Sequence, residues 1–273
     1  MQFSKTIYES VIVAGVLLGL ATARGDGLSA KDIMIKNEDA RKLINVTAKV
    51  KLVTGGGGST ERTKEFTWWR KLGADTVHYN TLTRFHFPPE VKNQGILFLE
   101  KGDATDIQMY LPSFKKIRRV ESQQQSGSFM GSEFSYSDIA TPHAADYSHR
   151  MLKENEPCKE GEKATTCYLI ESTPANDAVK ERTGSVNNLH WVRRDNFMAV
   201  KSEHYGSSGE LWKTIQFSAN TEVSTKDHKW LAHQVRVENA KSKKFTTLAF
   251  SSVQVEEKVP DSTFTPQNLS REK

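Results

Sequence analysis

The stretch Val46-Thr-Ala-Lys-Val-Lys-Leu52 alternates apolar and polar residues with a period of two. Such a period places the apolar side chains on one face of a β-strand and the polar side chains on the other face. Four consecutive glycines at 55–58 follow, and they predict a tight turn. The segment therefore predicts a half-buried strand that turns back into a second strand.

The same alternation returns in the second half of the chain, in residues 211–217 and 231–238. In residues 245–255 the apolar phase slips between Phe250 and Val253, which predicts a bulge or a bend in that strand. Turn-forming residues recur about every 8–12 residues, as is typical of antiparallel all-β proteins. We therefore expect a large antiparallel sheet with one wet face.

One long helix is expected before the first strand. Ser29 and Asp32 have the spacing of a capping box, and the apolar residues between Ile33 and Ile44 roughly follow helical spacing. Residues 135–138 predict the start of a second, short helix. The expected fold class is therefore mainly β, with an N-terminal helix and a few short helices.

The composition excludes several classes of protein. The chain has 273 residues, of which 37% are hydrophobic, and this fraction is too low for a polytopic membrane protein. The 13 Phe, 5 Trp and 7 Tyr are too many for a disordered chain. A net charge of +5 is only a mild excess, and no basic-aromatic motif indicates nucleic-acid binding.

Residues 1–23 have the pattern of a cleaved signal peptide. Lys5 precedes an apolar run at 11–20, and Ala21-Thr-Ala23 provides a cleavage site. The alternative is a retained membrane anchor, but the uncharged run is about 14 residues long, whereas roughly 20 are needed to span a bilayer. We therefore expect export, with residues 24–273 forming a single domain.

Export changes the interpretation of the two cysteines. Cys158 and Cys167 are separated by eight polar or small residues, including Gly161, as at the tip of a hairpin. In an oxidising compartment this pattern predicts a structural disulfide. Zinc is a poor alternative because only two thiols exist and no histidine lies between them.

Known catalytic motifs do not occur in the sequence. It has no GxSxG, HExxH, P-loop or GxGxxG pattern, and its eight histidines lack the spacing of a helical metal site. We therefore expect no enzymatic activity, no cofactor and no metal.

The centre of the chain contains its most specific motif. Tyr110-Leu-Pro112 is followed by Lys115-Lys-Ile-Arg-Arg119, then by Ser128-Phe-Met-Gly131 and Phe134-Ser-Tyr-Ser-Asp138. In these segments the sequence resembles the outer-membrane lipoprotein-sorting family, the LolA-like exported proteins associated with RND-type exporters. The resemblance extends over about residues 30–270.

The resemblance implies a fold and a function. The fold would be an unclosed, strongly curved antiparallel β-barrel, with helices on its concave face and an apolar cavity between helices and sheet. The function would be that of a soluble periplasmic carrier or chaperone, which holds acyl chains of lipoproteins or lipids during transfer between membranes. The implied partners are these acyl chains, an RND-type exporter and, transiently, a membrane surface, and no nucleic acid.

Two groups of residues are candidates for such a function. Adaptable apolar side chains could line the cavity, although they could equally fill the core. A basic cluster could contact lipid headgroups or an exporter, although it could equally be a solvated strand edge that blocks aggregation. The first group consists of Phe85, Phe87, Met109, Leu111, Phe129 and Met130, and the second of Lys115, Lys116, Arg118 and Arg119.

Two other functions remain open at this point. The chain could be an accessory interaction module of an exporter that carries no lipid itself. It could also be an integral outer-membrane barrel, but the many charged residues within its strands argue against this, since a lipid-facing charge near the midplane costs about 2–4 kcal/mol.

Overall fold

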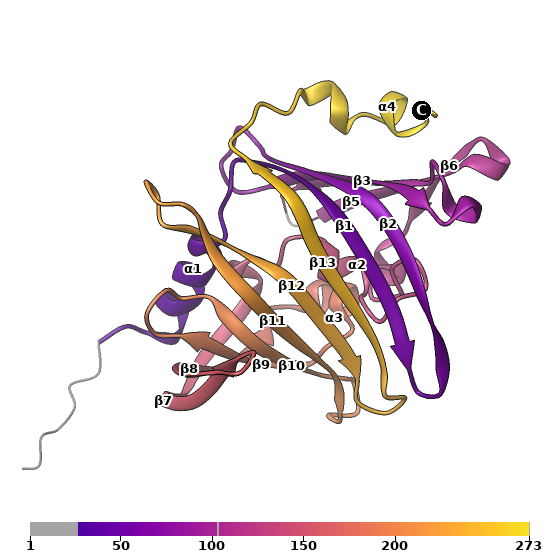
Figure 1. Cartoon of the computed structure of the whole chain (residues 1–273). Coiled ribbons are helices and arrows are strands. Elements are labelled where there is room, and N and C mark those ends of the chain that lie inside the picture. The colour runs from indigo at the N-terminus through magenta and orange to yellow at the C-terminus, as the bar shows by residue number, and fades with distance from the viewer. Residues whose placement is uncertain (1–26, 103, 273) are drawn as a thin grey trace, which may run out of the picture.

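The computed structural model describes residues 27–102 and 104–272, which form one antiparallel sheet of thirteen strands (Figure 1). The predicted signal peptide at residues 1–23 lies outside the described residues. The strands are β1 (Asn45–Gly56), β2 (Ser59–Leu72), β3 (Tyr79–Phe87), β4 (Gly95–Lys101), β5 (Ala104–Leu111), β6 (Lys116–Val120), β7 (Tyr147–Glu160), β8 (Lys163–Pro174), β9 (Asn187–Arg193), β10 (Ala199–Tyr205), β11 (Leu211–Ser224), β12 (Lys229–Asn239) and β13 (Lys244–Val255).

The sheet consists of two runs of sequential strands joined in the middle. Its order is β6-β5-β4-β3-β2-β1-β13-β12-β11-β10-β9-β8-β7. The strands β1 and β13 pair in the middle of the sheet. The sheet is not closed, because its edge strands β6 and β7 do not pair with each other. At the junction Val50 lies opposite Phe66 of β2 and Phe250 of β13. The predicted unclosed antiparallel sheet is therefore confirmed.

The helices are short apart from the first. They are α1 (Ala30–Ala40), α2 (Tyr136–Ile139), α3 (Asp177–Thr183) and α4 (Pro266–Leu269), with 3-10 turns η1 (Pro89–Val91), η2 (Pro112–Phe114), η3 (Ser122–Gln124), η4 (Ala144–Asp146) and η5 (Asp261–Phe264). Figure 1 shows α1, α2 and α3 on the inner side of the bent sheet, and α4 beside β3 at the end of the chain.

The N-terminal helix begins where the sequence predicts. Ser29 and Asp32 form a complete capping box, which satisfies backbone N–H groups that the first turn leaves free. The helix ends at Ala40, earlier than the apolar spacing suggested, and Ile44 is exposed. Its buried residue Ile33 packs against Tyr168 of β8 and its neighbours, which fixes α1 over the β7–β9 end of the sheet.

The other half of the concave face is covered by the segment that links β6 to β7. Phe129 and Phe134 of this segment are buried against the inner residues of β1–β5. The alternation in β1 predicted these inner positions, since its buried residues are Val46, Ala48, Val50 and Leu52. The main core therefore lies between the concave face and residues 129–139.

The bulge predicted in the last strand is present. The pairing of β1 with β13 shifts between Thr47 and Lys49, opposite Gln254 and Ser251. Ser252 has a positive φ of 48°, as the extra residue of an irregular strand can have. Because bulges increase local twist, this position contributes to the bend of the sheet.

The convex face is not uniformly wet, contrary to expectation. The segment after β13 returns over β3–β5, where Leu269 of α4 and Phe264 of η5 pack against Leu82 and Leu97. These two leucines alternate with inward-facing Phe85, Ile96 and Phe98, so β3 and β4 are buried on both faces. The C-terminal helix is therefore a cover on the convex side, whereas the predicted short helices were placed on the concave side.

Candidate functional site

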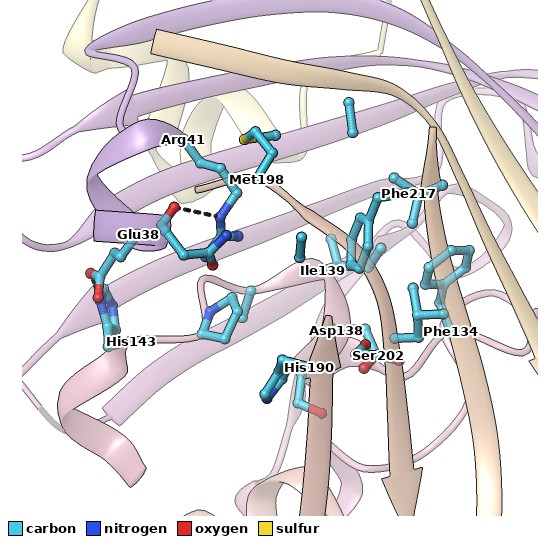
Figure 2. Close-up of a pocket in the computed structure, with 18 of the residues that line it drawn as sticks. Glu38, Arg41, Phe134, Asp138, Ile139, His143, His190, Met198, Ser202 and Phe217 are labelled. Carbon is cyan, nitrogen blue, oxygen red and sulfur yellow. Dashed lines mark hydrogen bonds and ion pairs between the residues drawn. The ribbon is translucent and has the colours of Figure 1, made fainter. Parts of the chain in front are cut away.

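A cavity of about 280 Å³ lies between the concave face, α1 and residues 134–149 (Figure 2). It occupies the gap between the two covers of the concave face, the helix α1 on one side and the β6–β7 linker on the other. Its walls differ in chemistry. The sheet provides an apolar wall, while α1 and the linker provide most of the charged groups.

The apolar wall comes from inward-facing residues of five strands. Their inward orientation follows from the period of two in each strand. Two of the side chains, Trp68 and Phe250, pack edge to face with ring centroids 5.5 Å apart. The principal apolar residues of this wall are Val46, Phe66, Trp68, Phe217, Val235 and Phe250.

The helix α1 presents Asn37 and Glu38 to the cavity, and its C-cap residue Arg41 adds a third polar side chain. Residues three and four apart lie on one face of a helix, which explains why all three side chains face the cavity. The Asn37 Nδ2 donates a hydrogen bond to the carbonyl of Phe197 at 2.7 Å. This bond fixes the rotation of α1 about its axis.

His143 lies between two carboxylates at this end of the cavity. Its Nδ1 donates to Glu38 at 2.8 Å, and its Nε2 lies 3.4 Å from Glu100 Oε2 of β4. Burial disfavours the imidazolium, but Glu100 and Glu38 outweigh burial and raise the pKa of His143 to about 9. His143 is therefore a cation at neutral pH.

The remaining carboxylate oxygens bind backbone N–H groups. Glu38 Oε2 accepts from Ala144 N at 2.8 Å. Glu100 accepts from Thr141 N at 2.9 Å and from Tyr79 N at 2.8 Å. Burial opposes ionisation, yet His143, these donors and the charges of Arg70 on Glu100 and Arg41 on Glu38 lower the pKa of both carboxyl groups. Both glutamates are therefore anions held by fixed partners.

Arg70 of β2 stands beside this group. Its guanidinium carbon lies 3.9 Å from the centroid of the Tyr79 ring, and its Nη2 donates to the hydroxyl of Thr141. Stacking of this kind holds a guanidinium in place without neutralising its charge. Arg70 therefore adds a second positive charge near Arg41.

Two histidines lie deeper, on β9 and β10. The ring centroids of His190 and His204 are 6.5 Å apart. Burial lowers the pKa of His190 to about 3 and that of His204 to about 4, so both are neutral at neutral pH. They contribute polar but uncharged surface.

His149 and Ser172 are hydrogen-bonded, and their pair is structural in its geometry. His149 Nε2 lies 2.9 Å from the carbonyl of Ala144, to which it can only donate. Burial lowers the pKa of His149, and in the neutral ring the other nitrogen, Nδ1, accepts from the Ser172 hydroxyl at 2.8 Å. His149 lies on β7, so these two bonds join β7 to β8 and to η4. Among the described residues, no group of three His, Cys, Asp or Glu side chains could hold a metal ion.

The predicted cavity residues lie elsewhere in the core. Phe85 and Phe129 are fully buried with ring centroids 6.2 Å apart, and neither lines the cavity. Met109 and Met130 come together, since Gln94 Nε2 donates to both sulfur atoms, at 3.2 and 3.3 Å.

The other two predicted residues lie near the end of the sheet. Phe87, the last residue of β3, is 47% exposed, and Leu111, the last residue of β5, is half-buried. The structure thus unites four of the six residues in one half of the core, where Phe85 and Phe129 pack behind Phe66 of the cavity wall.

The basic cluster lies on and beside the edge strand β6. Lys115, Lys116, Arg118 and Arg119 are all exposed, and Arg119 forms an ion pair with Asp106 at 2.7 Å. Charged side chains on an edge oppose pairing with another sheet, and the same exposure leaves them accessible to headgroups or to a partner.

The predicted disulfide is confirmed. Cys158 and Cys167 are bonded and join β7 to β8 near the tip of their hairpin.

In the part of the chain that the structure describes, no helix is long and apolar enough to cross a bilayer.

The polar residues of the cavity were not predicted. Glu38 and His143 are 105 positions apart, and Arg70 and Thr141 are 71 positions apart, so no local pattern relates them. The one available signal was the spacing of Glu38 and Arg41 on the predicted helix.

Comparison with solved structures identifies the fold. A DUF1329 family protein from Desulfovibrio piger superposes with a TM-score of 0.80 at 22% identity, covering 88% of this chain and 97% of that chain. A putative outer membrane lipoprotein-sorting protein domain from Vibrio parahaemolyticus gives 0.79 at 22% identity, with coverages of 89% and 98%. A LolA superfamily protein from Nitrosomonas europaea gives 0.68 at 22% identity, with coverages of 88% and 99%.

Sequence comparison gives two further results. No curated protein sequence matches the chain. A family model described as "-like: Uncharacterized protein" matches residues 78–271, which is more than half of the chain. The chain therefore belongs to the family of this model, and it has the fold of the LolA-superfamily lipoprotein-sorting proteins.

Proposed function

We propose that the chain is an exported, periplasmic carrier that holds acyl chains of lipids or lipoproteins in the cavity during transfer between membranes. The observation that carries the proposal is the cavity itself, which has an apolar wall inside an unclosed sheet. Each methylene group moved from water into such a wall contributes about 0.8 kcal/mol, so a long chain binds tightly with few polar contacts.

The fold supports this proposal. One of the similar structures is described as an outer membrane lipoprotein-sorting domain, and it superposes over nearly its whole length. A carrier requires a protected apolar surface and no reacting groups. The buried, neutral state of His190 and His204 fits a wall of the cavity better than an acid–base role at neutral pH.

The exposed basic cluster is the proposed contact with the membrane. The four cations lie at one sheet edge and can approach anionic headgroups, where an unpaired cation contributes roughly 1 kcal/mol; Arg119 is already paired with Asp106. An RND-type exporter, which the resemblance of the central motif implies, is the proposed protein partner in transfer.

Filling the cavity tests the carrier function. Val235 of β12 lines the cavity, and the next residue towards the N-terminus, Gln234, is exposed on the opposite face. Val235→Trp is expected to reduce binding of a fluorescent fatty acid at least about tenfold, because the indole occupies the space of the chain. Gln234→Trp is the matched control and is expected to leave binding unchanged.

Two measurements complete the test. Thermal unfolding of both variants shows whether they are folded, and Phe217→Trp on β11 replaces Val235→Trp if that variant is not. Mass spectrometry of solvent extracts from the natively purified protein is expected to find acyl-chain material. Absence of such material, together with no uptake of the fluorescent fatty acid by the unmodified protein, would contradict the proposal.

A further inference from the structure

Arg41 lies at the C-terminal end of α1 with its side chain at the cavity (Figure 2). Its Nε donates to the carbonyl of Asn37 at 3.2 Å. Within residues 27–102 and 104–272, no carboxylate forms an ion pair with Arg41, and both Nη atoms lack a protein acceptor. The guanidinium therefore retains a free pair of donors at the cavity.

Arg70 is the second guanidinium at this end of the cavity. Its Nη2 donates to Thr141, its plane lies over the Tyr79 ring, and its Nε is buried without an acceptor in the described part of the chain. These contacts fix the position of the group and leave its charge without an ion-pair partner among the described residues.

The nearby carboxylates form no ion pair with the two arginines, although the charge of Glu38 favours the Arg41 cation and the charge of Arg70 favours the Glu100 anion. Glu38 binds His143 and Ala144 N, and Glu100 binds Tyr79 N and Thr141 N and lies against His143. All four carboxylate oxygens are thus occupied by other donors. Two negative charges face three positive charges, from His143, Arg41 and Arg70, and this end of the cavity has a net positive charge.

The remaining charged pair at the cavity does not change this balance. Asp138 forms an ion pair with Lys213, so the charges of these two residues balance each other. Burial, together with the positive charge of Arg70, lowers the pKa of Arg41, which shows that the second cation destabilises the first. A bound anion would relieve this repulsion.

The apolar wall begins across the cavity from Arg41. Figure 2 shows Glu38, Arg41 and His143 on one side and Phe134 and Phe217 on the other. The cavity therefore has a cationic end and an apolar end, as a binding site for an amphiphile requires.

We infer that the cargo is an anionic amphiphile, whose carboxylate or phosphate binds at Arg41 and Arg70 while its acyl chain lies along the wall formed by Phe217 and Phe250. The inference rests on the proposed carrier function and adds the charge and the orientation of the cargo. Guanidinium groups suit this role because their planar donors match the oxygens of carboxylates and phosphates in pairs.

Paired probes with the same acyl chains, one anionic and one uncharged, test the inference. The first pair is a fluorescent fatty acid and its methyl ester, and the second pair is phosphatidylglycerol and diacylglycerol with the same chains. The unmodified protein is expected to bind the anionic member of at least one pair about tenfold or more tightly than the neutral member. Which pair shows the preference distinguishes a carboxylate from a phosphate as the headgroup.

Substitutions locate the preference. Arg41→Gln and Arg70→Gln are each expected to remove most of it while affinity for the neutral probe stays within about twofold. Arg41→Lys keeps the charge but loses the planar fork, and we expect an intermediate preference. Arg62→Gln removes an exposed arginine of β2 and is expected to change nothing.

The outcomes separate this inference from the carrier function. Equal affinity of the unmodified protein for charged and neutral probes would overturn the anionic cargo and leave the carrier intact. No binding of any probe would overturn both. If Arg70→Gln does not fold, the result for Arg41→Gln decides. An equal loss of affinity for the charged and the neutral probe in a folded Arg41→Gln protein would also overturn the inference.

Discussion

The Nζ of Lys213 donates a hydrogen bond to Oδ2 of Asp138 at 2.5 Å, linking β11 to the short helix α2. Only 2% of the Lys213 side chain and 10% of the Asp138 side chain are exposed. Asp138 Oδ2 also accepts from Ser135 N at 2.7 Å, within the capping box of α2. The pair thus joins the β6–β7 linker, which covers the cavity, to the sheet that forms its wall.

Breaking this buried pair on one side is expected to be costly. Lys213→Met leaves a buried carboxylate without its cation, and Asp138→Leu leaves a buried ammonium, so each should lower the free energy of unfolding by about 3–5 kcal/mol. The double variant should lose less than the sum of the two losses. Urea unfolding of the four proteins measures the coupling, with Arg150→Met as a control at an exposed pair, where about 1 kcal/mol or less is expected. Additive losses would show that the two groups are not coupled.

His143 is expected to make stability depend on pH in the alkaline range. Its pKa is raised in the folded protein to about 9, above the value of an unfolded histidine, so its contribution is complete below about pH 6.5 and is lost as the pH rises through 9. With partial solvent screening, the loss should be roughly 2 kcal/mol. Unfolding in urea at pH 6 and pH 10 is expected to show this loss in the unmodified protein and much less of it in His143→Asn. An identical pH dependence in both proteins would contradict the assignment.

The disulfide is expected to stabilise the hairpin at the β7 edge. Because it closes a short loop, its loss should lower the free energy of unfolding by about 2–3 kcal/mol. The Cys158→Ser, Cys167→Ser double variant and the reduced unmodified protein should show the same loss. Reductant should not affect the double variant, and a further loss in that variant would point to a different cause.

The C-terminal cover is expected to matter for stability and not for the cavity. Leu269 is fully buried on the convex face, so Leu269→Ala should cost about 2–5 kcal/mol. Gln267→Ala, on an exposed position of the same helix, is the control. Fatty-acid binding by the folded fraction of Leu269→Ala should match that of the unmodified protein, and a changed affinity would show that the two faces of the sheet are coupled.

Local patterns predicted much of the fold. The alternation in residues 46–52, the capping box of Ser29 and Asp32, and the slipped phase after Phe250 each reflect geometry set within a few residues. The convex cover was missed because it depends on a long-range return of the chain. A signal for it existed in Ile96-Leu-Phe-Leu99, since a continuous apolar run is typical of a strand buried on both faces.

The candidate site was harder to predict than the fold. The apolar wall uses residues that alternate in their strands, but the same alternation fills an ordinary core, so it does not indicate a cavity. The cationic end joins Arg41, Arg70 and His143 from three distant segments, and their proximity depends on how the covers sit on the sheet. In the sequence, Phe85 and Phe129 cannot be distinguished from Phe217, because all three are phenylalanines in apolar positions. Only the packing shows that Phe217 lines the cavity while Phe85 and Phe129 lie in the core.

The strands β6 and β7 are the two free edges of the sheet, and this opening affects how the size of the cavity can vary among proteins of this architecture. In a closed barrel the number and stagger of the strands fix the diameter of the interior. Here the space depends on the distance at which α1 and residues 134–149 sit from the sheet. Substitutions or length changes in these two covers can therefore enlarge or shrink the cavity while every strand keeps its hydrogen-bonding register.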